Sequence, residues 1–332
     1  MPAKLWSSLG DGFVRCEACA QRCVIGTDKM GKCCVRGNKR GVLLSLVESL
    51  YAGISLEPVE RRSLYHFLPG SNCVAVQGLG CSLACSFCPE FESALLPQDR
   101  HVLRGQRVAL ERLARQTESS RAACVVFCGG EPGVSFESVY EAAGRLMTCG
   151  LKIALRTNGY ASRDCLMDLY RRVQAASVSL MAFSDKFYQE QCGGRLQPVL
   201  DGLKTMHGIG WWLEISTPVI AGLNDGQDEF RAMARFIRDE LGPETPWHLH
   251  RFAPTYKLAY HAETPLSRME QCRAMAHEEG LLFVYTDETP ESTLCPQCGG
   301  VIVHRAPQTR AQLRAPQGIC PQCGQHMAGI WS

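Results

Sequence analysis

The sequence lacks the features that mark membrane, fibrous and disordered proteins. No run approaches the ~18 apolar residues of a bilayer span. The first segment, MPAKLWSSLGDG, has no apolar stretch of a secretion signal, and no internal repeat of roughly 20 to 50 residues is visible. A net charge of +2 gives no broad electrostatic reason to bind nucleic acid or membranes. These absences, with 45% hydrophobic residues, predict a globular cytoplasmic protein.

Cysteine, in contrast, is abundant. The count of 19 is odd, and without a secretion signal we expect metal ligands rather than disulfides. Isolated cysteines in periodic segments are expected to pack in the core; these include Cys124, Cys149, Cys165, Cys192 and Cys272. The others gather mainly in three clusters, namely Cys16/Cys19/Cys23/Cys33, Cys81/Cys85/Cys88 and Cys295/Cys298/Cys320/Cys323.

The middle of the chain alternates strand-like and helical patterns. Apolar runs at 73–80, 123–128, 152–157, 176–183, 211–217 and 247–252 read as buried strands. Helical spacing between them, as at 136–147 and 230–241, favours a parallel sheet covered by helices. Periodicity alone does not choose between a partial barrel and an open doubly wound sheet. We predict a cysteine-rich head (1–40), a connecting segment (41–72), an α/β core (73–290) and a zinc-ribbon module (291–332).

The middle cluster lies in GCSLACSFCPEF, directly after the first predicted strand. Cys81, Cys85 and Cys88 are spaced C-x3-C-x2-C, and no fourth cysteine follows at short range. Three thiolates on a [4Fe–4S] cluster leave one iron open, and an open position is typical of a chemical site. The end of a parallel strand is also where α/β folds place active sites. The alternative is a zinc site completed by a distant residue.

The next strand ends in Gly129-Gly130-Glu131-Pro132, where two glycines allow a ligand to approach the backbone closely. With the cysteine motif, and Phe87 before its third cysteine, this order resembles the radical SAM superfamily. The resemblance implies that S-adenosylmethionine (SAM) binds the open iron and that the Gly129–Pro132 stretch holds its amino group. Reductive cleavage of SAM would give a 5′-deoxyadenosyl radical that abstracts a substrate hydrogen.

A closer resemblance covers nearly the whole chain. CEACAQRCVIGTDKMGKCCVRGN, SLYHFLPGSN, TNGY, VIAGLND and PWHLHRFAP are similar to AmmeMemoRadiSam-system radical SAM enzymes, relatives of pyruvate formate-lyase activating enzymes. This implies a partial (β/α)6 barrel, with Asn158 lining the SAM pocket and His248 and Arg251 facing the substrate. By analogy, it also implies Memo-type or AMMECR-type partners and a flavodoxin or ferredoxin as electron donor. It names no substrate.

One position departs from the activating enzymes. Where they carry Asp-x-Lys on the fourth strand, this chain has Ser179-Leu180-Met181. The change removes a carboxylate and an ammonium from a site for a zwitterionic sulfonium, so a substrate other than a glycyl-radical enzyme becomes more plausible. Pro89 and Glu90 also replace the usual Gln-Asn after the cysteine motif.

The head cysteines, spaced C-x2-C-x3-C-x9-C, suit either a structural zinc or an auxiliary iron–sulfur cluster. We favour zinc, because a closed site would order a segment too short to fold by hydrophobic burial. Cys34 is an alternative fourth ligand.

The tail contains CPQCG twice, which predicts a zinc ribbon; rubredoxin-type iron is the alternative. Arg305, Arg310 and Arg314 would offset the charge of the thiolates or bind an acidic partner or nucleic acid.

The sequence therefore predicts a radical SAM enzyme acting on a protein, peptide or small molecule. One alternative is a zinc-rich adaptor protein on an inert α/β core. Another is an RNA-modifying radical SAM enzyme, which the near-neutral charge disfavours. His248 and His250 lie two apart on a predicted strand, hence on one face, and are expected to form a polar pocket wall rather than a metal pair.

Overall fold

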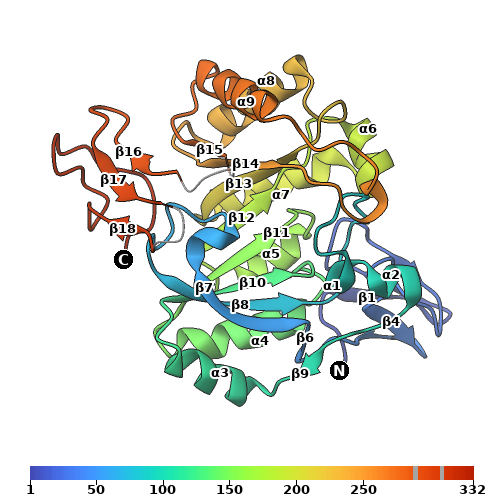
Figure 1. The fold of residues 1–332 in the computed structure, drawn as a ribbon. Helices are drawn as coiled ribbons and strands as arrows, with labels where there is room; N and C mark the ends of the chain where they lie inside the picture. Colours follow the sequence, from blue (N-terminus) through green and yellow to red (C-terminus); the bar gives the residue numbers. More distant parts are fainter. Residues whose placement is uncertain (287–290, 307–309) are drawn as a thin grey trace.

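An eight-stranded sheet forms the centre of the molecule in a computed structural model that describes residues 1–286, 291–306 and 310–332 (Figure 1). Seven strands are parallel. They are β8 (Asn72–Gly78), β10 (Cys124–Gly129), β11 (Lys152–Thr157), β12 (Ala175–Ser179), β13 (Trp212–Val219), β14 (Trp247–Arg251) and β15 (Val284–Thr286). The eighth, β7 (Gly53–Pro58), pairs antiparallel with β8 at the edge.

The order of strands in the sheet decides between the two predicted architectures. It runs β15-β14-β13-β12-β11-β10-β8-β7, so that chain order and spatial order agree throughout. A doubly wound sheet reverses its order at a switch point, and this sheet does not. The partial (β/α)6 barrel is therefore confirmed. Two strands were not predicted: β15 follows β14, which we expected to be the last, and β7 lies in the predicted connecting segment.

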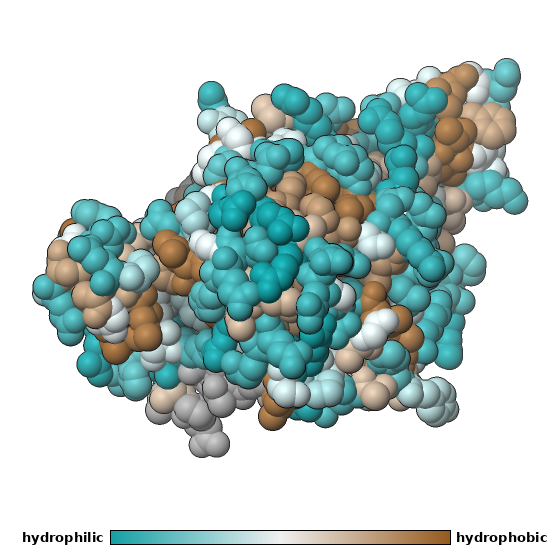
Figure 2. All heavy atoms as spheres, turned by 90° about the horizontal axis from the view of Figure 1, so that it is seen from above, coloured by the Kyte–Doolittle hydropathy of each residue, from teal (hydrophilic) through white to brown (hydrophobic). Residues whose placement is uncertain are grey.

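Helices cover the outer face of the curved sheet (Figure 1). They are α3 (Leu110–Ser119), α4 (Phe136–Met147), α5 (Arg163–Leu169), α7 (Leu196–Gly208), α8 (Gln227–Phe236) and α9 (Leu266–Glu278). The apolar positions that predicted α4 are buried on its inner face, including Phe136 and Leu146. The predicted helix at 230–241 is α8 followed by a π-helical turn, Ile237–Leu241. Viewed from the side of α8 and α9, the surface is largely hydrophilic with scattered hydrophobic residues (Figure 2).

The inner face of the sheet carries small side chains that form a second core. Cys73, Ala75 and Cys124 pack there against Leu64 and Phe67 of the segment after β7. This segment therefore fills part of the barrel interior. The isolated cysteines predicted to be in the core are buried, except Cys149, which is half-buried; the buried ones are Cys124, Cys165, Cys192 and Cys272.

The head forms two small antiparallel units beside the ends of the parallel strands (Figure 1). They are a sheet of β1 (Trp6–Gly10), β2 (Phe13–Cys16) and β3 (Val24–Ile25), and a hairpin of β4 (Arg36–Lys39) and β5 (Val42–Ser45). A buried ion pair joins head and core, since the Arg36 guanidinium donates to both Glu137 oxygens of α4 at 2.9 and 3.0 Å. The backbone N–H of Lys4 donates to the same carboxylate at 2.7 Å.

The tail forms a three-stranded sheet at the opposite end of the barrel (Figure 1). Its strands are β16 (Thr293–Leu294), β17 (Val301–His304) and β18 (Gln312–Leu313). The backbone N–H of Leu68 donates to the Ile330 carbonyl at 2.6 Å, which holds the end of the chain against the core. The predicted core boundary at residue 290 lies outside the described residues. No helix in the described part of the chain is long and apolar enough to cross a membrane.

Candidate active site and metal centres

An open cavity of about 580 Å³ lies at the carboxyl ends of the parallel strands, within the usual size range of small-molecule sites. The loops after β8 and β10 and the ends of β11, β12, β13 and β14 line it. Of the predicted site residues, those of the cysteine motif, the first three of the glycine-rich turn, Asn158 and Arg251 contribute to its wall. They are Cys81, Cys85, Phe87, Cys88, Gly129, Gly130, Glu131, Asn158 and Arg251. Pro132 instead lines a small neighbouring space beneath this turn.

Hydrogen bonds from distant elements hold the cysteine loop in place. The Gln98 side chain, from helix α2 (Leu96–Arg100), donates to the carbonyls of Cys81 and Leu83 at 2.8 and 2.9 Å. The Asn158 amide donates to the Cys81 sulfur at 3.4 Å and to the Ser82 hydroxyl at 3.2 Å. Donors aimed at a sulfur favour its thiolate form, so these contacts suit a metal-binding loop.

The free thiols of the motif hold their protons firmly. Burial, and then the charge of Glu131, raises the pKa of Cys81 well above its usual value. Burial likewise raises the pKa of Cys88 to about 12. A metal bound by these sulfurs must displace the protons, so its binding would strengthen as the pH rises.

A fourth cysteine lies beside the motif. A hydrogen bond with the buried Cys192 thiol, together with burial, raises the pKa of Cys85 well above its usual value. The backbone N–H of Ala84 donates to the Cys192 carbonyl at 2.8 Å. Sequence reasoning placed Cys192 in the core, and it is buried, but nothing in the sequence indicated this neighbour.

The backbone conformation and close packing of the glycine-rich turn require glycine at two positions. Gly129 has a φ of +83°, and a Cβ on Gly130 would lie 2.7 Å from the main chain of Leu79 and Gly80, so side chains are excluded there. The buried carboxylate of Glu131 accepts hydrogen bonds from the Thr157 hydroxyl at 2.6 Å and the Asn158 N–H at 2.8 Å. Glu131 therefore ties the end of β11 to the turn after β10, which leaves the glycine backbone facing the cavity.

The cavity wall on β12 is uncharged, as the sequence predicts. Ser179 and Met181 line the cavity, while Leu180 is fully buried behind them. The Ser179 hydroxyl lies 3.1 Å from that of Ser216 on β13. A positive charge comes instead from Arg156 on β11, whose guanidinium has no hydrogen bond or ion pair within the described residues. Sequence reasoning missed Arg156, although it directly precedes TNGY.

The two predicted substrate-facing residues lie at different depths. Arg251 lines the cavity, and its guanidinium donates to the Thr264 carbonyl at 2.6 Å and to Glu263 at 2.9 Å. His248 is buried deeper and lines a smaller cavity of about 270 Å³ on the inner side of the barrel. Arg156 and His250 contribute to both cavities.

His248 is oriented by a buried carboxylate that sequence reasoning did not identify. Its Nε2 lies 2.8 Å from Glu214 on β13, and burial lowers the pKa of His248, so the neutral ring donates. The Glu214 carboxylate also accepts from the N–H groups of Tyr65 and His66 at 2.7 and 2.8 Å. Burial opposes ionisation of Glu214, but these hydrogen bonds, the one from His248 first, keep its pKa below the usual value.

The rings of His248 and His250 are stacked, with centroids 6.5 Å apart. His250 Nε2 lies 3.0 Å from the Ser63 hydroxyl, while His248 Nε2 is bound to Glu214. The pair therefore forms a polar wall, as expected from the sequence.

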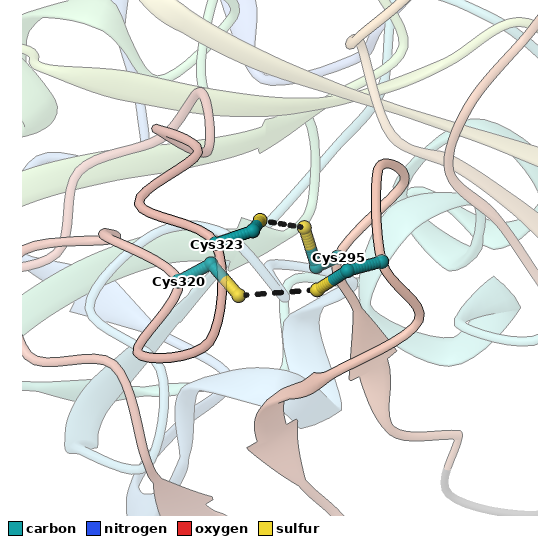
Figure 3. A group of neighbouring side chains, drawn as sticks. Cys295, Cys320 and Cys323 are labelled. Atoms are coloured by element: carbon teal, nitrogen blue, oxygen red, sulfur yellow. Dashed lines mark hydrogen bonds between the residues drawn. The ribbon is translucent and has the colours of Figure 1, made fainter.

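The four tail cysteines come together in an arrangement that could hold a metal ion (Figure 3). The sulfurs of Cys295 and Cys323 are 3.6 Å apart, those of Cys298 and Cys320 are 3.5 Å apart, and all four lie within 4.8 Å of one another. Backbone N–H groups, first that of Cys323, lower the pKa of Cys320 to about 7. Four sulfurs in this arrangement fit one tetrahedral zinc ion.

The tail arginines do not form the binding patch that the sequence left open as an alternative to charge compensation. Arg305 is buried, stacks on the Tyr65 ring and donates to the Tyr65 carbonyl at 2.7 Å. Arg310 donates to the Gly70 carbonyl, and Arg314 is exposed. Two of the three therefore dock the tail onto the core.

The head cysteines are arranged differently. Cys16, Cys19 and Cys33 are buried and Cys23 is half-buried. Among the residues that the structure describes, only the tail cysteines bring three or more ligand atoms within 4.8 Å of one another. The spacing of the head sulfurs therefore gives no support to the expected zinc ion.

Comparisons with known proteins agree with this picture. The sequence model of the radical SAM superfamily matches residues 77–237. An uncharacterised protein of Methanocaldococcus jannaschii is 31% identical over 307 residues, 91% of each chain. A probable RNA methyltransferase of Chromobacterium violaceum is 29% identical over 180 residues, 51% of this chain and 49% of the relative. The solved structure of Streptococcus suis SuiB shares the fold with a TM-score of 0.51 and 15% identity, covering 70% of this chain and 52% of SuiB.

The fold and the cavity define a partial-barrel enzyme with a cysteine loop at the ends of its strands. The chain belongs to the radical SAM superfamily, whose members use a [4Fe–4S] cluster and SAM. The narrower resemblance to AmmeMemoRadiSam-system enzymes stays a prediction.

Proposed function

We propose that Cys81, Cys85 and Cys88 hold a [4Fe–4S] cluster and that SAM binds beside it in the 580 Å³ cavity. The observation that supports this proposal is the cavity itself, because its wall combines the three sulfurs with the exposed backbone of Gly129 and Gly130. When reduced, the bound pair supplies a 5′-deoxyadenosyl radical that abstracts a hydrogen atom from the substrate.

The protein's own residues would orient SAM and keep the site in shape. The Asn158 amide, fixed by the Cys81 sulfur and the Ser82 hydroxyl, holds the cysteine loop against the end of β11. Arg156 offers a positive charge on the strand next to β12, where the activating enzymes carry their lysine. It is therefore suited to bind the SAM carboxylate or an anionic group of the substrate.

The substrate would enter the barrel interior below SAM. The smaller cavity of about 270 Å³ continues the site past Arg156 and His250, and His248 lies in its wall. We infer that His248, held by Glu214, and Arg251 contact the substrate, which is a protein segment, a peptide or a small molecule. An electron donor of the flavodoxin or ferredoxin type and a partner of the Memo or AMMECR type stay predictions.

The similarity to probable RNA methyltransferases does not favour RNA as the substrate. The net charge is only +2, and Arg305 and Arg310 are engaged within the chain. RNA binding depends on phosphate neutralisation by free cationic side chains.

The proposal is tested by reconstituting the full chain with iron and sulfide under anaerobic conditions and reducing it with dithionite in the presence of SAM. We expect release of 5′-deoxyadenosine, and its loss in the Cys81→Ala, Cys85→Ala and Cys88→Ala variants. The Cys149→Ala variant, which replaces a half-buried cysteine just after the C-terminal end of α4, should retain the activity. Release of 5′-deoxyadenosine from any of these three cysteine variants, or none from cluster-loaded wild type, would contradict the proposal.

A further inference from the structure

The head cysteines form a site of their own on the core. Strand β2, the segment between β2 and β3, and the loop before β4 contribute Cys16, Cys19, Cys23 and Cys33. Burial, and then the charges of Cys33, Cys16 and Cys23, raises the pKa of Cys19, so the four thiols lie near one another. Arg36 places a buried positive charge beside Cys16 and Cys33, which suits a site that collects thiolates.

The spacing between sulfurs distinguishes two kinds of four-cysteine site. Around one zinc ion, with Zn–S bonds of about 2.3 Å, tetrahedral geometry puts the sulfurs about 3.8 Å apart. The tail meets this condition, with pairs at 3.5 and 3.6 Å. In an iron–sulfur cubane each thiolate binds a different iron, so the sulfurs stand farther apart.

The head does not meet the condition for a single zinc ion. Within the part of the chain that the structure describes, neither the head cysteines nor the motif of Cys81, Cys85 and Cys88 gather within 4.8 Å as the tail cysteines do. The cysteine sulfurs therefore lie close together in the tail, whereas those of the head and those of the Cys81/Cys85/Cys88 motif do not all lie within 4.8 Å of one another. We propose that Cys16, Cys19, Cys23 and Cys33 bind a second [4Fe–4S] cluster, with a thiolate on every iron.

Burial and neighbouring charges favour Cys33 over Cys34 as the fourth ligand. Cys33 is buried, and the charges of Cys16 and Cys23 help to raise its pKa, whereas Cys34 is half-buried and of the four only Cys23 helps to raise its pKa. Cys33 therefore closes the site, and Cys34 is available as a matched control.

The site lies against the cysteine loop of the active site. Cys19 forms a β-bridge with Ala161, three residues after Asn158. The Gln21 side chain donates to the Ser82 carbonyl at 2.9 Å, next to Cys81. Because every iron of the head cluster is ligated by cysteine, it cannot bind SAM, and its chemistry is confined to one-electron transfer.

The full chain, purified and reconstituted under anaerobic conditions, should contain about eight iron, eight sulfide and one zinc per chain. The Cys16→Ser/Cys33→Ser variant should lose about four iron and four sulfide and keep its zinc. After dithionite reduction, the variant should retain the electron paramagnetic resonance signal that SAM perturbs, which also shows that its core is folded. Cys34→Ser should match the wild type in metal content and in spectrum.

About four iron and two zinc in the wild type would overturn the proposal, whatever the variants do. Loss of zinc rather than iron from the head variant would overturn it as well. Both results are independent of SAM cleavage, so they leave the proposed function standing.

Discussion

Replacement of Glu214 is the change whose effect on stability the structure predicts most sharply. Its buried carboxylate accepts hydrogen bonds from the N–H groups of Tyr65 and His66, from His248 Nε2 and from Trp212 Nε1, over 2.7 to 3.1 Å. These donors come from two strands and from the segment that fills the barrel. Glu214 therefore joins the inner side of the sheet to that segment.

Replacing Glu214 by glutamine keeps the size but removes half of the acceptors. The amide retains one oxygen and turns an NH2 group toward N–H donors, so at least two of the four donors lose their partner. At roughly 1 to 3 kcal/mol for each buried unpaired donor, the free energy of unfolding should fall by roughly 2 to 6 kcal/mol.

The measurement is urea unfolding followed by tryptophan fluorescence on the metal-loaded chain. Glu240→Gln is the control, because Glu240 forms an exposed ion pair with Lys204 at 2.7 Å and should cost less than about 1 kcal/mol. If Glu214→Gln costs no more than Glu240→Gln, the carboxylate is not the charged acceptor that we describe. The reasoning about the barrel interior would then be refuted.

Three further predictions concern the cavity, acid stability and the tail. Arg156→Ala should raise the SAM or substrate concentration needed for half-maximal 5′-deoxyadenosine release, with Arg156→Lys intermediate; unchanged concentrations in both would remove Arg156 from the site. Burial lowers the pKa of His66 from 6.5 to about 4, so the unfolded chain takes up its proton first and stability should fall as the pH drops from 6.5 to 4. Urea unfolding across this range should show a smaller slope in His66→Gln, and an equal slope would contradict the assignment. Cys298→Ser should lose about one zinc with iron unchanged, by metal analysis, whereas loss of iron would point to a rubredoxin-type tail.

The partial barrel was predictable because its signals are local. Each strand and each helix of the repeating unit has its own apolar pattern, as Phe136 and Leu146 show for α4. The strands β7 and β15 were missed because both are edge strands, and β15 is only three residues long. In short edge strands the alternation of apolar and polar residues is weak, so their sequence is difficult to distinguish from that of a loop.

The candidate site was only partly predictable. The cysteine motif, the glycine-rich turn and Asn158 are short stretches with a recognisable spacing, and they all reach one cavity. Cys192 and Glu214 have no such signature, since their partners lie far away in the chain, and Arg156 is identified only by its place in the cavity wall.

By itself, the sequence identified most of the residues that line the candidate site, because cysteine spacing and glycine-rich turns are local requirements of metal and ligand binding. It also determined the alternation of strands and helices that makes a partial barrel. Only the tertiary structure decided that Glu214 holds His248, that Arg305 docks the tail, and that the tail sulfurs are compact while the head sulfurs are not. These properties depend on distances between residues remote in the chain, and folding alone sets such distances.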